Sequence, residues 1–408
     1  MKHLIIPGVL LLLFTTSNLT SQWVQMSNGM GNISVPSLAY SGSNLFAGTY
    51  NYGVYLSTNN GTSWIQSSLN FHWITSLAVN GNNVFAGTHD SGVYLSTNNG
   101  TSWTQTSLNN RTVYSLAVNG NNVFAGILGY GVYFSTNNGT TWTQVGLNYR
   151  NIYALTINEN YIFAGTGSYG VYLSTNNGTS WTQTSLNNET VWSLAVNGNI
   201  VFAGGLQYFG VYLSTNNGTS WTQTSLNNRV VYSLAVSGNN VFAGTSSNGV
   251  YLSNANGTNW TQRNEGLGNL TVLALCILNN YIFAGTSNYG VYRRPLSELV
   301  GIQPISSEIP LGFSLSQNYP NPFNPSTKIR FDIPPSEGAG GRTVRIIVYD
   351  VLGREVSTLV NEQLSPGTYE VDWDAENYTS GVYFYQLTVN SGQLTKRIVD
   401  TKKMIVVK

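Results

Sequence analysis

The first three quarters of this 408-residue chain offer little material for acid–base or metal chemistry. Between Gln22 and Arg294 the acids are Asp90, Glu159, Glu189 and Glu265, which are spread widely, and the histidines are His72 and His89. Glycoside hydrolysis usually needs two carboxylates about 5–9.5 Å apart. The patterns Ser-His-Asp, HExxH and Gly-Lys-Ser/Thr are absent, and Cys276 is the only cysteine. We therefore expect no catalytic residues, no metal site and no cofactor.

The charge of the chain argues against several classes of partner. Seventeen Lys and Arg residues face sixteen acids, so the net charge is +1 and only 8% of residues are charged. A chain without a strong electrostatic field is not expected to bind nucleic acid. The charges are also unevenly placed, because 12 of the acids and 10 of the bases lie between Pro295 and Lys408. This change in composition predicts a domain boundary near residue 295.

The N-terminus has the layout of a secretory signal peptide. A basic start is followed by the apolar stretch 4–14 and by the small, polar stretch 15–21. The apolar stretch is shorter than the ~20 residues that span a bilayer. We expect residues 1–21 to be removed on export, which would leave no transmembrane segment in the mature protein.

A repeat of 39 to 41 residues organises the chain from residue 22 to residue 295. Phe-Ala-Gly occurs seven times, and Gly-Val-Tyr follows it each time. Each unit holds four short stretches of strand character, which in the second unit are 74–79, 83–86, 92–96 and 102–106. Four antiparallel strands in about 40 residues are typical of a β-propeller blade. The sequence therefore predicts an all-β chain with a seven-bladed propeller over residues 22–295.

The seventh unit lacks its fourth strand. A tryptophan marks the fourth strand of the first six units, whereas the seventh unit stops at Pro295 without one. The missing pattern stands at the other end, where Gln22-Trp23-Val24-Gln25 is similar to the Trp-Thr-Gln of the other units. We expect this N-terminal segment to complete the last blade, which would leave the ring without an open sheet edge.

The turn between the third and fourth strands repeats most faithfully. It reads STNNGTSW over residues 57–64 and returns from Ser96, Ser135, Ser174 and Ser214, and more loosely from Ser253. The pattern resembles the Asp-box, or BNR, repeat, whose propellers include sialidases and some glycanases. It departs from that family where Asp is usual: the residues there are Asn59, Asn98, Asn137, Asn176, Asn216 and Ala255. The resemblance implies that these boxes are turn scaffolds distant from any active site, and the arginine motif of sialidases is absent.

Binding candidates lie in the loops that vary between units. The position four residues before each Ser/Ala-Leu pair is occupied by Ile33, His72, Arg111, Arg150, Glu189, Arg229 and Leu270. Equivalent places in successive blades should form a ring around one mouth of the central channel. We predict ligand-binding residues at His72, Arg111, Arg150, Glu189 and Arg229, with Tyr130 and Tyr169 as stacking surfaces, for an acidic glycan or a carboxylate-bearing partner. Ordinary solvated loops are the alternative.

The last part of the chain carries a different signal. After a proline-containing linker at 296–313 come NYPNPFNPST at 318–327, VYDVLGREV at 348–356, SGVY at 380–383 and KKMIVVK at 402–408. These elements resemble the type A C-terminal sorting domain of the type IX secretion system of Bacteroidetes-like bacteria. Alternating strand patterns suggest a small Ig-like β-sandwich over residues 314–408. The resemblance implies that this segment engages the type IX secretion machinery, and that the protein reaches the cell surface or the medium.

These observations favour a secreted, non-catalytic propeller that binds an extracellular glycan or protein. Two alternatives stay open: an extracellular carbohydrate-active enzyme of the glycosidase or sialidase kind, and a structural component of a surface layer.

Overall fold

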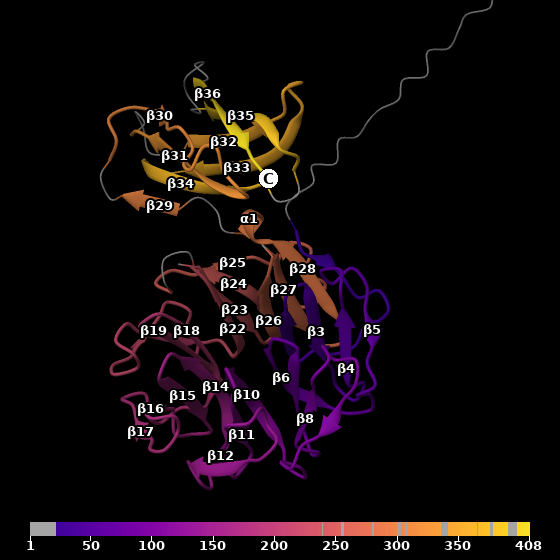
Figure 1. The fold of residues 1–408 in the computed structure, drawn as a ribbon. Coiled ribbons are helices and arrows are strands. Elements are labelled where there is room, and N and C mark those ends of the chain that lie inside the picture. The colour runs from indigo at the N-terminus through magenta and orange to yellow at the C-terminus, as the bar shows by residue number, and fades with distance from the viewer. Residues whose placement is uncertain are drawn as a thin grey trace, which may run out of the picture.

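A computed structural model describes residues 22–238, 240–253, 257–279, 281–299, 303–306, 309–335, 342–364, 366–375, 378–390 and 398–408. These described residues form nine four-stranded sheets, and seven of the sheets are blades arranged around a central channel (Figure 1). The all-β fold with a seven-bladed propeller is thereby confirmed. The expected signal peptide, residues 1–21, lies outside the described residues.

In six blades the strands follow sequence order from the channel outward, and in the seventh blade β1 is the outermost strand, after β26, β27 and β28. The innermost strands are β2 (Ser37–Ser41), β6 (Ile74–Asn80), β10 (Val113–Asn119), β14 (Ile152–Asn158), β18 (Val191–Asn197), β22 (Val231–Ser237) and β26 (Val272–Leu278). The second strands are β3 (Asn44–Gly48), β7 (Asn83–Thr88), β11 (Asn122–Ile127), β15 (Tyr161–Thr166), β19 (Ile200–Gly205), β23 (Asn240–Thr245) and β27 (Tyr281–Thr286).

The two outer strands of each blade are shorter. The third strands are β4 (Val54–Ser57), β8 (Val93–Ser96), β12 (Gly131–Ser135), β16 (Val171–Ser174), β20 (Val211–Ser214), β24 (Gly249–Ser253) and β28 (Val291–Pro295). The fourth strands are β5 (Ile65–Gln66), β9 (Thr104–Gln105), β13 (Thr143–Gly146), β17 (Thr182–Gln183), β21 (Thr222–Gln223), β25 (Thr261–Gln262) and, for the seventh blade, β1 (Val24–Gln25).

The hydrophobic core of the propeller lies between neighbouring blades. The phenylalanine of each Phe-Ala-Gly triplet is almost completely buried. Phe46 of the first blade, for example, packs in one cluster with Leu77 and Val84 of the second, and Trp103 lies against the same cluster. Because each blade face is covered by the next blade, truncating one such phenylalanine would cost about 3–5 kcal/mol.

The boxes are turns held by their own side chains. In the first box the Ser57 hydroxyl donates to Asn59 Oδ1 at 2.9 Å, and the backbone N–H of Ser63 donates to the same oxygen at 3.0 Å. The Gly61 N–H donates to Ser57 Oγ at 2.9 Å. The same bonds recur in the boxes that begin at Ser96, Ser135, Ser174 and Ser214.

Glycine is required in the box for two reasons. Gly100 has φ +77°, a left-handed conformation that side chains disfavour, and a Cβ on it would lie 2.8 Å from Cε1 of Phe46 in the preceding blade. Gly218 meets Phe163 in the same way, also at 2.8 Å. The box is thus a packing surface for the neighbouring blade as well as a turn.

The N-terminal segment closes the ring. Strand β1 pairs antiparallel with β28, with Val24 opposite Arg293 and Gln25 opposite Tyr292. Trp23 is 2% exposed, and its indole N–H donates to the Arg263 carbonyl at 2.7 Å. Two segments more than 260 residues apart in the sequence, at the start and the end of the propeller, therefore share one blade (Figure 1).

A repeated glutamine fastens every fourth strand. The side-chain amide of Gln25 donates to the Tyr289 carbonyl at 2.8 Å, across the junction between the first and last strands of the propeller. The same bond, from the fourth strand to the loop before the third, is made by Gln66, Gln105, Gln144, Gln183, Gln223 and Gln262. The last blade is thus fastened as the other six are.

The C-terminal part is a two-sheet sandwich. One sheet has the order β29 (Gln303–Ser306), β34 (Gly367–Asp374), β31 (Ser326–Ile333) and β30 (Ser314–Leu315), and the other has β33 (Glu355–Leu364), β32 (Arg342–Tyr349), β35 (Gly381–Asn390) and β36 (Ile398–Val406). Trp373, Phe331 and Tyr385 lie in the core between the sheets. The sandwich is confirmed.

One detail of the C-terminal part differs from the sequence expectations. The expected linker contains the short helix α1 (Leu296–Leu299) and strand β29, which pairs with β34. The last strand, β36, pairs with β35 without interruption from Ile398 to Val406. Its charged residues lie along an edge strand, which tolerates them.

The NYPNPFNPST segment is anchored by buried polar contacts. Asn318 is 2% exposed and donates from its amide to Thr327 Oγ1 at 2.9 Å. The Tyr385 hydroxyl accepts from the Asn318 N–H and donates to the Ser316 carbonyl. Burial raises the pKa of Tyr385 to about 12, so this hydroxyl keeps its proton for that second bond.

Candidate binding site at one mouth of the channel

The propeller has two unlike faces, which we name by their loops. The box face carries the boxes and the turns that join the first and second strands of each blade. The mouth face carries the loops that join the second and third strands and the loops that join one blade to the next. A cavity of about 380 Å³ lies at the channel end on the mouth face. Its size falls within the ~300–1,000 Å³ typical of small-molecule sites.

Equivalent residues of all seven blades line this cavity. They are Pro36, Thr75, Tyr114, Tyr153, Trp192, Tyr232 and Leu273, and the lining is completed by Tyr50, Trp73 and Leu206. Six of the ten lining residues are aromatic, and none of these described residues is charged.

A β-bulge places these side chains in the channel. In six blades the pairing of the first and second strands skips one residue, as between Val113 and Ser115 in the third blade. Val113 and Leu116 pack between blades, and the skipped Tyr114 lines the cavity. In the first blade the equivalent residue is Pro36, which lies just before β2 and has no N–H to give to a ladder.

The aromatic rings of the cavity contact one another. Trp192 stacks on Tyr153 with ring centroids 4.6 Å apart, and Tyr114 lies 5.1 Å from Tyr153 and 5.7 Å from Trp192. On the other side Trp73 meets Tyr50 edge-on at 4.7 Å. These rings offer flat apolar surfaces next to phenol and indole donors.

Burial keeps two of the cavity phenols protonated. It raises the pKa of Tyr50, and the neighbouring phenols of Tyr232 and Tyr114 raise it further. It also raises the pKa of Tyr114, beside Tyr153. The hydroxyls therefore remain neutral and can donate and accept hydrogen bonds. Trp73 Nε1 is buried and has no hydrogen-bond partner among the described residues.

The seven predicted ring positions are equivalent in the structure. The backbone carbonyls of Ile33, His72, Arg111, Arg150, Glu189, Arg229 and Leu270 each accept from the glycine N–H before a third strand, at 2.7–3.1 Å. They lie on the mouth face, but over the third strands and therefore farther from the axis than the cavity. Their role in binding stays a prediction.

The predicted arginines and tyrosines form pairs. The Arg111 guanidinium lies 4.2 Å from the ring centroid of Tyr130, and that of Arg150 lies 3.6 Å from the centroid of Tyr169. One face of each tyrosine is thus covered by an arginine rather than open for stacking. Glu189 makes no ion pair with a described residue; burial and then the Glu189 charge raise the pKa of Tyr212.

The sequence reasoning did not select the cavity residues Tyr114, Tyr153, Trp192 and Tyr232. A signal was present, because buried residues follow one another at spacings of three and then two, as in Val113, Leu116 and Val118. A regular strand would keep a spacing of two. The extra residue marks a bulge, and a bulge at the end of a strand redirects a side chain.

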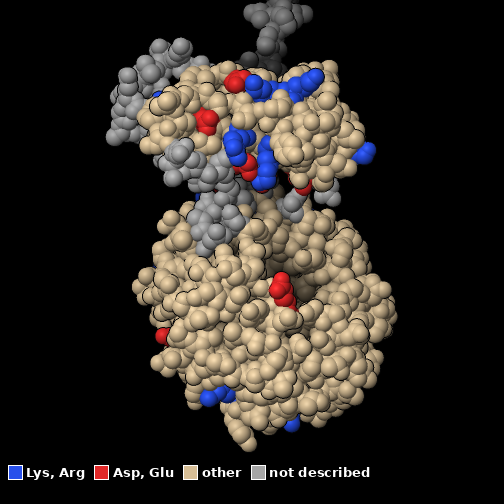
Figure 2. Space-filling view, turned by 60° about the vertical axis from the view of Figure 1, so that its left-hand side comes forward, with Lys and Arg blue, Asp and Glu red and all other residues tan. Residues whose placement is uncertain are grey.

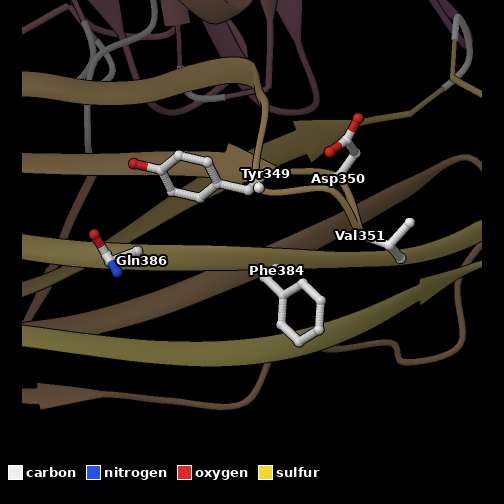
Figure 3. Close-up of a pocket in the computed structure, with 6 residues that line it drawn as sticks. Tyr349, Asp350, Val351, Phe384 and Gln386 are labelled. Atoms are coloured by element: carbon white, nitrogen blue, oxygen red, sulfur yellow. The ribbon is translucent and has the colours of Figure 1, made fainter.

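A second hollow, of about 450 Å³, lies on the C-terminal domain (Figure 3). Asp350 and Val351 come from the turn after β32, and Phe384 and Gln386 come from β35. The carboxylate of Asp350 accepts from the N–H groups of Leu352 and Arg354 and from Arg354 Nε, which lowers its pKa. This acid holds its own turn, so the hollow offers no free ionised group.

The two parts of the chain differ in charge. On the side shown in Figure 2, the propeller carries few charged side chains, whereas Lys and Arg side chains gather on the C-terminal domain. Within the described residues, no three His, Cys, Asp or Glu side chains lie close enough to hold a metal. No helix in that part of the chain is both long and apolar enough to cross a membrane.

Comparison with known proteins identifies the C-terminal part. Residues 317–401 match the family described as the secretion system C-terminal sorting domain. The chain therefore carries a type IX sorting domain, which indicates export out of the cell, either to the surface or into the medium. No curated protein matches the chain.

Solved structures similar to the propeller show its fold alone. The WD40 repeats of RRP9 have a TM-score of 0.56 at 12% identity and cover 67% of this chain and 97% of theirs. YCF48 from Cyanidioschyzon merolae has a TM-score of 0.55 at 12% identity, over 67% of this chain and 98% of its own. The GH74 enzyme of Niastella koreensis has a TM-score of 0.51 at 20% identity, over 65% of this chain and 43% of its own.

Proposed function

We propose that the exported propeller is a non-catalytic binding module whose ligand occupies the aromatic cavity of the mouth face. The observation that carries the proposal is the convergence of seven equivalent positions, six of them bulged, on one cavity. Within the repeat these positions vary from Pro36 to Trp192, although their neighbours hardly change. Packing between blades does not require aromatic residues there, because Thr75 and Leu273 occupy equivalent places.

The ligand class that suits the cavity is an uncharged carbohydrate. Stacked rings such as Trp192 and Tyr153 match the apolar face of a sugar ring, and the neutral phenols of Tyr50 and Tyr114 match its hydroxyls. A charged ligand would leave water without meeting an opposite charge in the lining. Two of the three arginines at the ring positions, Arg111 and Arg150, lie over Tyr130 and Tyr169.

Catalysis has less support in this site. A glycosidase needs an acid and a second carboxylate close to the scissile bond, and the described lining residues include no acid. The propeller acids Asp90, Glu159, Glu189 and Glu265 belong to four different units.

Binding and turnover can be measured on the same glycans. The full mature chain would be applied to an array of neutral and acidic glycans, and the release of reducing ends would be followed in parallel. Binding of neutral glycans without release supports the proposal. Release of reducing ends would show that the protein is an enzyme. Binding confined to acidic glycans would place the site at Arg111, Arg150 and Arg229 instead of the cavity. No binding at all would favour a structural role and reject the proposal.

A further inference from the structure

Three exposed aromatic residues on the mouth face have an unusual backbone. Phe71, Tyr149 and Tyr208 have φ of 61°, 63° and 64°, in the left-handed region, and their side chains are 83%, 93% and 70% exposed. Bulky side chains rarely adopt this backbone, and an exposed ring recovers nothing from burial. Neither local propensity nor packing accounts for these residues.

Other blades show what the same backbone accepts more easily. Phe71 and Tyr149 stand four residues before their bulged residues, and the equivalent residues of the other five blades are all asparagine. Two of these, Asn110 and Asn228, have the same left-handed φ, of 52° and 53°. Asparagine tolerates that region better than other non-glycine residues, so the second and fourth blades depart from the residue that fits.

Tyr208 is exposed because of a difference in loop length. The loop of the fifth blade between its second and third strands is one residue longer than in the other blades. Phe209 is buried and stacks on Tyr212 at 4.5 Å, which fixes the loop. The neighbouring Tyr208 is thereby presented to solvent on the mouth face.

All three residues lie close in sequence to cavity residues, but Phe71 and Tyr149 directly precede ring positions and therefore lie farther from the axis than the cavity. Phe71 is two residues from Trp73, Tyr149 is four from Tyr153, and Tyr208 is two from Leu206, and each of these partners lines the cavity. They belong to the second, fourth and fifth blades. The Arg111–Tyr130 pair of the third blade lies in the arc between Phe71 and Tyr149, so flat surfaces follow one side of the mouth.

We infer that Phe71, Tyr149 and Tyr208 form an aromatic rim that extends the cavity into a site for a polymer, an uncharged polysaccharide chain. This inference rests on the proposed function. The cavity holds one end or one residue of the chain, and successive sugar rings stack on the rim. Uncharged occupants are favoured because the lining is neutral and the propeller surface carries so few charges (Figure 2).

The test compares long and short ligands of one chemistry. Binding of soluble β-glucan, xylan and mannan would be measured by affinity electrophoresis, and binding of the corresponding disaccharides by calorimetry. The variant Phe71→Asn/Tyr149→Asn places in both blades the residue that their equivalents carry. We expect it to weaken polysaccharide binding by about tenfold and to leave disaccharide binding unchanged, because each stacked ring contributes modestly.

A matched control removes an exposed apolar side chain elsewhere. Ile65 is 74% exposed on β5, at the outer edge of the first blade, and five of the other six blades carry threonine there. Ile65→Thr should leave the binding of both ligand lengths unchanged.

The outcomes separate the two proposals. If the unaltered protein binds a polysaccharide and the double variant binds it equally well, the rim inference is wrong and the cavity proposal stands. If the double variant loses the polymer and its disaccharide in the same ratio, the rim inference is also wrong. If the unaltered protein binds none of the glycans, the proposed function fails, and binding of an unfolded polypeptide such as casein would then assign the surface to proteins.

Discussion

The two faces of the propeller are built from the same repeat, but the residues of the box face are nearly the same in every blade, whereas those of the mouth face vary. On the box face, turns of neighbouring blades are joined by side-chain bonds: Asn80 donates to the Gly120 carbonyl at 2.6 Å, and Asn197 to the Gly238 carbonyl at 2.8 Å. Ser41 makes the corresponding bond to Gly81 at 2.6 Å. On the mouth face, equivalent positions hold residues as different as Pro36, Thr75 and Trp192.

This difference separates the requirements of folding from those of binding. Each box must satisfy its own backbone and fit the phenylalanine of the preceding blade, so the six boxes have nearly the same sequence. The bulged residues leave the ladder and line the channel. Variation there has little consequence for blade packing, and the left-handed Phe71 and Tyr149 even oppose local preference. Residues that oppose the local backbone preference without a gain in packing are expected at functional sites.

Both faces depend on a closed ring, so opening the ring should have the largest effect on stability. Deleting residues 22–27 removes Trp23 and strand β1 and exposes the edge of β28. We expect the free energy of unfolding to fall by at least ~3–5 kcal/mol, the cost of a truncated buried tryptophan alone. Chemical denaturation measures it, and an unchanged midpoint would rule out closure by the N-terminal strand.

Replacing a cavity residue should separate binding from stability. Trp192→Leu places in the fifth blade the residue that Leu273 provides in the seventh, so the bulge and the blade should persist. Loss of the stack on Tyr153 should weaken ligand binding by about tenfold or more, with a change in stability below ~1.5 kcal/mol. Calorimetric titration with a glycan identified on the array measures binding. Retained affinity would place the ligand elsewhere.

The sequence alone predicted most of the fold and little of the site. Seven copies of Phe-Ala-Gly and the displaced Trp23 were enough for a closed seven-bladed ring, because a repeated unit must pack against its own copies. Short outer strands and boxes follow from local turn chemistry. The cavity was missed because Tyr114 and its equivalents lie inside strands, where the regular alternation of side chains hides a skipped residue.

The candidate site shows a second limit of sequence reasoning. The ring from Ile33 to Leu270 was located by equivalence, and its carbonyl bonds are indeed equivalent. The depth of a position within its blade, however, depends on which strand its loop covers, and that is a property of the fold. Pairing of Arg111 with Tyr130 likewise depends on rotamers that no spacing specifies.

Disrupting a single box should lower the free energy of unfolding by less than opening the ring does, and it should not affect ligand binding. Asn98 accepts from Ser96 Oγ and from the Ser102 N–H, at 2.9 Å each. Asn98→Ala should destabilise the propeller by ~1–2 kcal/mol, because a buried serine hydroxyl and a turn N–H lose their acceptor. Asn98→Asp keeps both acceptor bonds and should cost less. Equal losses in the two variants would mean that the amide N–H to Ser102 Oγ is the important bond.

The smallest effect should have the opposite sign, and it tests the contrast between the faces most directly. Phe71→Asn and Tyr149→Asn each relieve a bulky residue of a left-handed backbone that Asn110 and Asn228 already adopt. The rings are exposed, so little packing is lost, and we expect each variant to gain up to ~1 kcal/mol in stability. Calorimetric melting of the single and double variants measures the gain, with Ile65→Thr as the control for removal of an exposed apolar side chain. A gain in stability together with weaker polysaccharide binding is what a rim maintained against local preference requires. A loss of stability in both variants would mean that Phe71 and Tyr149 serve the fold, and the mouth face would then have to be explained by packing, as the box face is.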